Sequence, residues 1–317
     1  MNHNNNLKQT ILGAGGAIGT ELAKILPQYT SNIRLVARNP KKINETDELM
    51  PANLLNREAV FKAVEDSSIV YVLIGFAYNT KVWQQQWVPF IKNVIDACLQ
   101  YQCKLVFFDN VYALDANQIE HITESSAIHP ISKKGKVRAE VDNLILNAIE
   151  QQQLQAIIAR SPDFFGTTID KSLLMTMVYQ NLLKGKKAQW ICNASVIHSM
   201  GYTPDLAKGT ALLGNTNNAY NQIWNLPVSD QTLTGKEWIE LFAHAMQVSA
   251  KMQVLPKWAI QTLGIFIPII KELSEMTYQY DRDYFFDSTK FIKAFEYVPT
   301  TNFAAVNEVV NTLKANK

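Results

Sequence analysis

Glycines at three-residue spacing lie near the start of the chain, in Gly13-Ala14-Gly15-Gly16-Ala17-Ile18-Gly19. A β-branched apolar run, Thr10–Leu12, precedes this loop, and apolar residues at helical spacing follow it. In such a strand–loop–helix unit the first glycine permits a tight turn, the second lets the backbone approach a pyrophosphate, and the third allows close helix packing. The N–H groups and the positive dipole end of the helix then hold the anion. We therefore expect a dinucleotide to bind at Gly13, Gly15, Gly16, Ala17, Ile18 and Gly19.

The residue that follows the second predicted strand selects between two forms of such a cofactor. This strand, Ile33–Ala37, is followed by Arg38-Asn39-Pro40. A site for NAD places an acidic residue here to bind the ribose 2′-hydroxyl, and none is present. The guanidinium of Arg38 suits a 2′-phosphate instead, a charge-assisted contact of about 1.5–3 kcal/mol. We predict NADP in preference to NAD; the alternative is a solvated arginine at a strand end.

Strand and helix patterns alternate from Gln9 to about Arg160, which predicts a parallel sheet covered by helices on both faces. Short buried strands are expected at Thr10–Leu12, Ile33–Ala37, Ile69–Ile74, Leu105–Phe108 and Ala156–Ala159. Helices are expected at Ile18–Leu26, Glu58–Val64, Gln86–Leu99, Val137–Ile149, Leu173–Leu183 and Thr234–Met246, the last with Thr234 as its N-cap. We predict a doubly wound α/β domain over 7–165, to which 190–228 returns, and a smaller substrate-binding lobe over 166–317.

Composition excludes several classes of protein. The 317 residues carry 30 Lys and Arg against 28 Asp and Glu, a net charge of +2, so no broad basic face for nucleic acid is expected. The three widely spaced cysteines and the amide-rich N-terminus indicate a cytoplasmic protein with no secretory signal and no metal site. The longest apolar stretch, Trp258–Ile270, falls short of the ~20 residues of a membrane span. The alternatives are that it covers the pocket or a partner, or that it packs within the smaller lobe; we expect packing within the lobe, with no membrane partner.

Further motifs make the chain resemble the extended short-chain dehydrogenases/reductases, the NAD-dependent epimerase/dehydratase family. The glycine spacing has its form, Leu105–Tyr112 resembles its strand ending in Val-Tyr-Gly, and Arg160–Gly166 resembles its Arg-Pro-x-x-x-Tyr-Gly segment. The resemblance spans essentially the whole chain and implies a Rossmann fold. It places Asn53, where relatives carry Asp, near the adenine, and assigns Gly75 to the cofactor site.

The catalytic positions that the resemblance implies carry other residues. The family uses a Tyr-x-x-x-Lys helix, and its tyrosine and lysine correspond here to Lys134 and Arg138. The Ser or Thr that polarises the substrate oxygen corresponds to Phe108. Arg138 keeps the charge and reach to donate to cofactor ribose hydroxyls. Lys134 is either a proton donor, if its surroundings bring its pKa toward neutrality, or part of a solvated helix start or phosphate clamp.

Substitute acids follow the strands whose carboxyl ends bind ligands in open α/β sheets. Asp109, Asn110 and Tyr112 follow one strand, and Tyr78 follows another. We select Tyr112, Lys134 and Arg138 as the catalytic candidates, with a packed ring as the alternative for Tyr112. For Asp163, Asp205, His129 and His198 we expect structural roles instead.

Two functions remain open. The first is an atypical NAD(P)-dependent oxidoreductase or nucleotide-sugar epimerase/dehydratase-like enzyme, acting on a small nucleotide-sugar or other carbonyl substrate through a non-standard acid. The second is a non-catalytic NADP(H)-binding redox sensor resembling NmrA-like proteins, which also lack the tyrosine. By analogy with relatives, the helices over Gln86–Leu99 and Val137–Ile149 are expected to form a homodimer.

Overall fold

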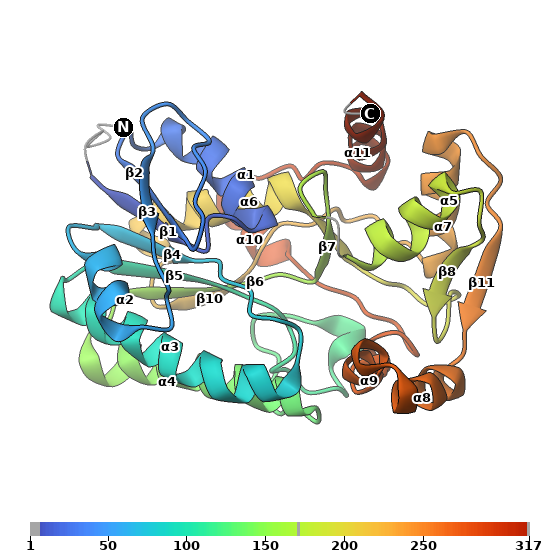
Figure 1. Ribbon diagram of the computed structural model, residues 1–317, viewed down its shortest axis with the longest axis horizontal. Helices are drawn as coiled ribbons and strands as arrows, with labels where there is room; N and C mark the ends of the chain where they lie inside the picture. Colours follow the sequence, from blue (N-terminus) through green and yellow to red (C-terminus); the bar gives the residue numbers. More distant parts are fainter. Residues whose placement is uncertain (1–6, 170–171, 316–317) are drawn as a thin grey trace. The chain divides into compact units, whose positions relative to one another are not determined.

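Seven parallel strands form one sheet in the computed structural model, which describes residues 7–169 and 172–315 (Figure 1). The strand order is β10-β6-β5-β4-β1-β2-β3. The strands are β1 (Gln9–Leu12), β2 (Ile33–Ala37), β3 (Glu48–Pro51), β4 (Ile69–Val72), β5 (Lys104–Asp109), β6 (Ala156–Arg160) and β10 (Gln222–Asn225). The order turns back at β1, since β2 and β4 pair on its two sides. This topology confirms the predicted doubly wound parallel sheet, whose ligands bind outside the carboxyl ends of the strands.

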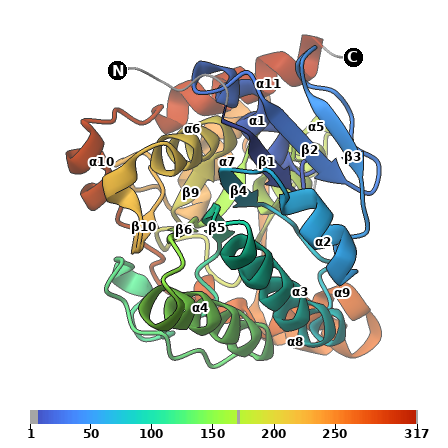
Figure 2. The same cartoon turned by 90° about the vertical axis from the view of Figure 1, so that its left-hand side faces the viewer.

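Helices cover both faces of this sheet (Figure 2). One face carries α2 (Arg57–Val64), α3 (Thr80–Gln100) and α4 (Lys133–Gln152), and the other carries α1 (Ala17–Ile25) and α6 (Thr203–Gly214). Side chains of α2, α3 and α4 form one apolar core with the strands, and the fully buried Val60, Ile91 and Val141 belong to it. On the opposite face Gly214 of α6 lies so close to the Tyr71 ring of β4 that a Cβ would lie 2.4 Å from its hydroxyl.

The chain divides by its internal contacts into two units. The first holds the chain up to Ala113, Lys134–Ser161 and Leu206–Leu226; the second holds Leu114–Lys133, Pro162–Asp205 and the chain from Pro227. We predicted the first domain to run unbroken to 165, whereas 114–133 groups with the second unit. The reason is local pairing: the Ile122 N–H donates to the Phe285 carbonyl (2.8 Å), and Ile122 forms a parallel bridge with Phe286.

The second unit contains two small parallel sheets and several helices. One sheet pairs β7 (Asp163–Phe165) with β9 (Met200–Tyr202), and the other pairs β8 (Ala188–Ile191) with β11 (Met252–Leu255). Its α-helices are α5 (Gln180–Leu183), α7 (Gly235–Met246), α8 (Lys257–Phe266), α9 (Pro268–Ser274), α10 (Thr289–Phe295) and α11 (Asn302–Ala315). A π-helix, Leu174–Tyr179, precedes α5, and short 3₁₀ helices lie in the chain at Leu26–Gln28, Ile119–His121, Asn217–Ala219 and Thr277–Gln279.

Local signals placed two of these helices correctly. Thr234 caps α7 as predicted, since its hydroxyl accepts from the Glu237 N–H (3.3 Å) while the Glu237 carboxylate accepts from the Thr234 N–H (2.7 Å). The helix predicted over Leu173–Leu183 is observed as the π-helix followed by α5.

The prediction that Trp258–Ile270 packs inside the smaller lobe is wrong for most of its apolar side chains. Trp258 is 70% exposed, Ile265 76% and Phe266 78%. An apolar run in the sequence predicts that its side chains are buried against other apolar groups. It does not identify which part of the chain, or which other molecule, supplies those groups. Among the residues that the structure describes, no helix is long and apolar enough to cross a membrane.

Candidate functional site

The glycine loop between β1 and α1 is held against two neighbouring strands of the first unit. The N–H groups of Gly13 and Ala14 both donate to the Val36 carbonyl of β2, at 2.9 and 3.2 Å. Gly13 has a φ of +97°, and a Cβ there would lie 2.7 Å from the Ile74 nitrogen. Both the turn and the close approach therefore require glycine at this position.

Gly19 fixes the helix against the loop. A Cβ at Gly19 would lie 2.7 Å from the Gly13 carbonyl oxygen and 2.9 Å from the Ala14 Cα. Gly15 and Gly16 are exposed, and Gly16 is the N-cap of α1 with no capping side chain. Since the first turn of α1 has no acidic residue, the positive end of the helix dipole is not neutralised there. The N–H groups of Gly13, Ala14 and Gly16 bond within the first unit, so binding of a pyrophosphate at this end of α1 stays a prediction from the glycine spacing.

Arg38 and Asn53 lie next to this loop, after the ends of adjacent strands. Ala37 pairs with Pro51 in the β2–β3 register, and the Ala52 N–H donates to the Ala37 carbonyl (2.9 Å). Arg38 is exposed and forms no ion pair with any residue that the structure describes. The Asn53 Oδ1 accepts from the Leu55 N–H (3.2 Å), so the Asn53 side chain makes a local turn.

The remaining predicted cofactor contact, Gly75, follows β4 one residue after Ile74, which touches the glycine loop. Gly75 is exposed, and a Cβ there would meet no atom within 4 Å. The carboxyl ends of β1, β2 and β4 therefore bring together the glycines, Arg38 and Gly75. An anion cradle with an arginine beside it fits a phosphorylated dinucleotide.

Two tyrosines and a lysine meet beyond the ends of β4 and β5. The hydroxyl oxygens of Tyr78 and Tyr112 lie 3.5 Å apart, and the Lys134 Nζ lies 4.8 Å from the centre of the Tyr78 ring. The Trp83 ring stacks on Tyr112, with ring centres 6.0 Å apart and planes at 21°. Tyr112 is also held by its own N–H, which donates to the Asn110 Oδ1 (2.9 Å).

Lys134 is fully buried in the first turn of α4. A buried ammonium is costly, and the positive end of a helix dipole adds to that cost. The face of the Tyr78 ring offsets part of it through a cation–π contact. The structure therefore places the Lys134 ammonium against the Tyr78 ring, whose hydroxyl in turn meets that of Tyr112.

Arg138, the other cationic candidate, lies in the core of the first unit. Its Nε donates to the Asp109 Oδ1 at 2.7 Å, its Nη2 contacts the same oxygen, and its side chain is 3% exposed. The guanidinium carbon lies 4.3 Å from the centre of the Trp87 ring and 4.8 Å from that of Phe107. Only Nη1 makes no hydrogen bond with the described residues. The ion pair with Asp109 occupies the groups that we expected to meet the ribose.

A second buried pair adjoins the first. The Arg160 Nη2 of β6 donates to the Asp142 Oδ2 of α4 at 3.3 Å, and both side chains are fully buried. Burial, together with the nearby Asp109 carboxylate, raises the pKa of Asp142 well above its usual value against the opposing arginine charges. Asp142 and Arg160 were not singled out from the sequence. The sequence signal that could have identified Asp142 is its spacing of four residues from Arg138, which is itself four residues from Lys134. This spacing places all three side chains on one buried face of the helix.

Asp163, Asp205 and His198 have structural partners in the second unit, as expected. The His198 Nε2 lies 3.1 Å from the Asp163 Oδ2, and the hydroxyl of Tyr280 donates to the same oxygen. The His198 ring stacks between Tyr280 and Tyr284, each centre 4.5 Å away. Burial raises the pKa of Asp163, but the hydrogen bonds with His198 and Tyr280 outweigh it and hold that pKa below its usual value.

Asp205 and His129 complete the set of predicted structural residues. Asp205 accepts from the Tyr297 hydroxyl (2.9 Å) and from the Thr300 N–H (2.7 Å), which confirms its structural role. The exposed His129 lies 3.8 Å from Asp115 and has no other ion-pair partner in the described part of the chain. Over residues 7–169 and 172–315, no three His, Cys, Asp or Glu side chains gather as metal ligands.

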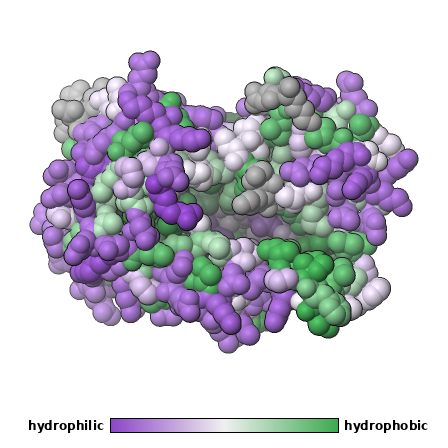
Figure 3. Space-filling view, viewed as in Figure 1, coloured by the Kyte–Doolittle hydropathy of each residue, from purple (hydrophilic) through white to green (hydrophobic). Residues whose placement is uncertain are grey.

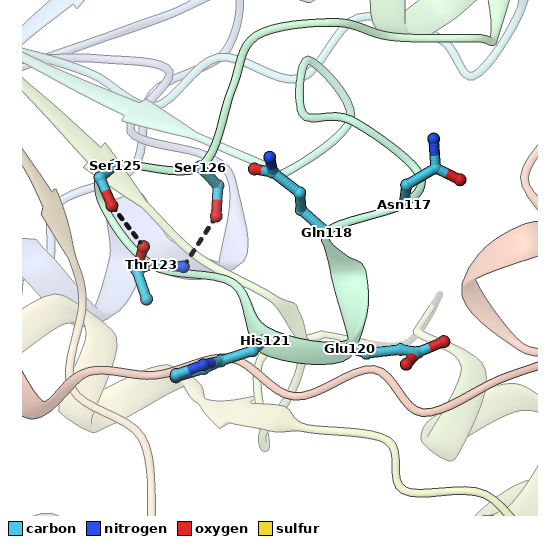
Figure 4. A pocket seen from close by; sticks show the side chains of 7 residues that line it. All are labelled: Asn117, Gln118, Glu120, His121, Thr123, Ser125 and Ser126. Carbon is cyan, nitrogen blue, oxygen red and sulfur yellow. Dashed lines mark hydrogen bonds between the residues drawn. The ribbon is translucent and has the colours of Figure 1, made fainter.

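A polar hollow of about 410 Å³ lies in the second unit (Figure 4). Its lining residues are Asn117, Gln118, Glu120, His121, Thr123, Ser125 and Ser126. The hydroxyls of Thr123 and Ser125 bond to one another (2.9 Å), and the His121 Nε2 lies 2.9 Å from Asp287. Thr123, Ser125 and Ser126 thus bond to one another, and the hollow holds none of the predicted site residues.

Comparison with known proteins identifies the class to which this site belongs. The model of the NAD dependent epimerase/dehydratase family matches residues 10–226, and the chain belongs to this family. The match ends where the first unit ends, at Leu226. No curated protein sequence matches the chain.

Three solved structures of similar fold are distant in sequence. UDP-N-acetylglucosamine 4-epimerase from Bacillus cereus is 15% identical with a TM-score of 0.76, covering 98% of this chain and 97% of that one. The dTDP-glucose 4,6-dehydratase of Bacillus anthracis, solved in complex with NAD, is 14% identical with a TM-score of 0.80 and the same coverage. UDP-glucose 4-epimerase of Thermus thermophilus, also with NAD, is 15% identical with a TM-score of 0.78, covering 98% and 100%. These likenesses establish the fold.

Proposed function

We propose that the chain is an NADP(H)-dependent oxidoreductase or epimerase/dehydratase-like enzyme that uses Tyr112 as its proton donor. The observation that carries this proposal is the group formed by Tyr78, Tyr112 and the buried Lys134 beyond β4 and β5. It supplies a phenol and a cation, the two chemical functions of the family's Tyr-x-x-x-Lys helix, from different positions. The substrate class is a nucleotide-sugar or another small carbonyl compound, by analogy with the structural neighbours.

The cofactor site supports a dinucleotide with an added phosphate. The exposed N-terminus of α1 and its glycine loop would hold the pyrophosphate. Arg38 would meet a ribose 2′-phosphate, with Lys41 and Lys42 exposed close by in the chain. The bound nicotinamide would supply or accept a hydride. NAD remains a candidate, since the structural neighbours solved with a dinucleotide carry NAD.

The proton would move between Tyr112 and the substrate oxygen. In a reduction the Tyr112 hydroxyl gives its proton to the carbonyl oxygen as carbon accepts the hydride, leaving a phenolate. Lys134 stabilises that negative charge, and Tyr78, 3.5 Å from Tyr112 between the two hydroxyl oxygens, can donate a hydrogen bond to the phenolate. Trp83 holds the Tyr112 ring in place by stacking.

A second function is favoured by the surroundings of Arg138. Its ion pair with Asp109 and the presence of Phe108 at the polarising position remove two groups that family enzymes use. A protein that binds NADP(H) as a redox sensor without turnover needs neither group. The homodimer expected through α3 and α4 is compatible with both functions.

Two measurements distinguish the enzyme from the sensor. NADPH binding is followed by its fluorescence, and turnover by nicotinamide absorbance over a panel of nucleotide-sugars and simple carbonyl compounds. For the enzyme, Tyr112→Phe should lower turnover by about 10²-fold or more while NADPH binding is unchanged. Tyr29→Phe, at a half-buried tyrosine of the first unit, serves as the matched control and should retain activity.

Lys134→Met tests the cation separately. It keeps the length and apolar stem of the side chain, so the core remains filled while the charge is lost. The enzyme hypothesis expects slower reduction, with a rate that falls only as the isolated phenol ionises near pH ~10, and a reverse oxidation that becomes faster toward that pH. NADPH binding that survives both substitutions, with no turnover of any substrate by the unsubstituted chain, would establish the sensor instead.

A further inference from the structure

The second unit exposes an apolar surface on two consecutive helices, α8 and α9. Figure 3 shows it as a hydrophobic area over these helices. Its largest side chains are Trp258, Ile265, Phe266 and Ile269, exposed by 70%, 76%, 78% and 52%. We call this surface the α8–α9 patch; Leu263, Ile267 and Leu273 complete it. Contiguous exposed apolar surface of this kind marks a site of interaction.

The two helices form a tight hairpin. Ile267 ends α8, and its N–H donates to the Leu263 carbonyl (2.9 Å), after which Pro268 begins α9. At Gly264 the backbones approach so closely that a Cβ would lie 3.1 Å from the Lys271 Cα. The hairpin is therefore a defined structure that presents its apolar residues on a fixed support.

The exposed side of α8 is largely apolar, with Gln261 and Thr262 as its uncharged polar residues. Only Ile260 and Gly264 of this helix are buried, and no residue of α9 is. Trp258, Ile265 and Phe266 lie away from that buried side. Since the described part of the second unit covers only one side, the other side needs an apolar environment from outside.

The chemistry of the patch favours a bilayer surface over a second protein. A stable protein interface takes about 20–30 residues from each partner, and the whole hairpin, Lys257–Ser274, has only 18. The stretch from Lys257 to Lys271 contains no acidic residue and has a lysine at each end, and the first acidic residue after it is Glu272, in the last turn of α9. Lys257 is paired with Asp281 (2.7 Å), whereas Lys271 is exposed without an ion-pair partner among the described residues. Tryptophan and phenylalanine beside lysine are typical of interfacial helices.

We propose that the α8–α9 patch docks the protein on the surface of a phospholipid bilayer, with a preference for anionic headgroups. The apolar tip at Ile265 and Phe266 enters the boundary between headgroups and acyl chains, Trp258 lies at the same level, and Lys271 contacts lipid phosphate. This contact lies on the surface and does not span the membrane. It departs from the expectation, drawn from composition, that no membrane takes part. It does not rest on the proposed function.

The test is co-sedimentation of the full chain with vesicles of phosphatidylcholine alone and of phosphatidylcholine with phosphatidylglycerol. The unsubstituted chain should bind both, and the anionic vesicles more tightly. The double variant Ile265→Glu, Phe266→Glu should bind at least about tenfold more weakly, since two large apolar side chains no longer leave water. Its thermal unfolding should be unchanged because both side chains are already exposed. Val298→Glu is the matched control, an 88% exposed apolar residue outside the patch, and should bind like the unsubstituted chain.

Three results would overturn the proposal. The first is no binding to either vesicle by the unsubstituted chain, and the second is equal binding by the double variant. The third comes from light scattering after size exclusion: a dimer that the double variant converts to monomers would identify a second copy as the occupant. Equal binding to both vesicle compositions would overturn the role assigned to Lys271.

Discussion

Exchanging the charge at Arg38 tests the choice of cofactor most directly. Arg38 follows β2, two residues after the Val36 carbonyl that anchors the glycine loop, and has no ion-pair partner among the described residues. Arg38→Asp therefore removes no contact that holds the fold. It replaces the predicted partner of a 2′-phosphate by a carboxylate, which is the group that an NAD site uses to bind the 2′-hydroxyl.

The expected loss of affinity has two parts. A charge-assisted hydrogen bond contributes about 1.5–3 kcal/mol, and it is absent in the variant. Two negative charges about 4 Å apart in water repel by about 1 kcal/mol. Together these give about 2.5–4 kcal/mol, or roughly 10²- to 10³-fold weaker NADPH binding at a factor of ten per 1.4 kcal/mol. NADH lacks the phosphate, so its affinity should stay the same or improve.

Fluorescence titration of both cofactors, at low and high salt, measures this difference. Lys92→Asp is the control, since it makes the same change of charge at an exposed residue of α3, outside the predicted cofactor site. If Arg38→Asp weakens the binding of NADPH and of NADH equally, Arg38 does not bind the 2′-phosphate. The same conclusion follows if the control variant loses as much NADPH affinity as Arg38→Asp. NADPH binding by the unsubstituted chain should also weaken with salt, because the contact is exposed.

Three further predictions concern stability. Arg138→Met should cost about 3–5 kcal/mol in denaturant unfolding, because it leaves a buried carboxylate unpaired; a loss below about 1 kcal/mol would refute this account of the ion pair. The pKa of Asp163 is lower in the folded state than in the unfolded state. Ionised Asp163 therefore contributes to folding stability above the unfolded pKa of about 3.9, and this stabilisation is lost as the pH falls through the folded pKa. Melting temperatures should therefore fall below about pH 4 more in the native chain than in Asp163→Asn, which cannot titrate; parallel curves would contradict the role of His198. Gly19→Ala should cost about 1–3 kcal/mol, since a Cβ there lies 2.7 Å from a backbone oxygen, whereas in Gly15→Ala the nearest atom is 4.0 Å away and little change is expected.

The central fold could be predicted because its signals are local. The predicted strand Ile33–Ala37 has the bounds of β2, since a run of buried β-branched and apolar residues ends sharply at Arg38. β3 was not predicted because it lies at the edge of the sheet and three of its four residues are exposed, so no apolar run marks it. β10 was also missed, since Gln222–Asn225 joins β6 only through pairing across about sixty residues of sequence.

The part of the candidate site that is formed by the backbone of the glycine loop could be predicted from the sequence. The part that depends on how buried side chains pack could not. Glycine spacing alone locates the loop, because a φ of +97° at Gly13 and a close backbone contact at Gly19 admit no side chain. The surroundings of Lys134 and Arg138 depend on which side chains of α3 and β5 they meet. The sequence pattern shows both residues as part of a basic helix start, yet each is buried. Tertiary contacts decide this, and no local pattern encodes them.

The substitutions around the catalytic positions depend on one another. A guanidinium buried at position 138 would be strongly destabilising without the Asp109 carboxylate, and Asp109 would be equally costly alone. The two residues therefore belong together, and Asp142 and Arg160 extend the same buried network. Restoring the family tyrosine by Lys134→Tyr would leave this network intact, with Arg138 still bound to Asp109 rather than free to assist a phenol. We therefore expect Lys134→Tyr to turn over the substrate panel no faster than the unsubstituted chain; a faster variant would contradict this account of Arg138.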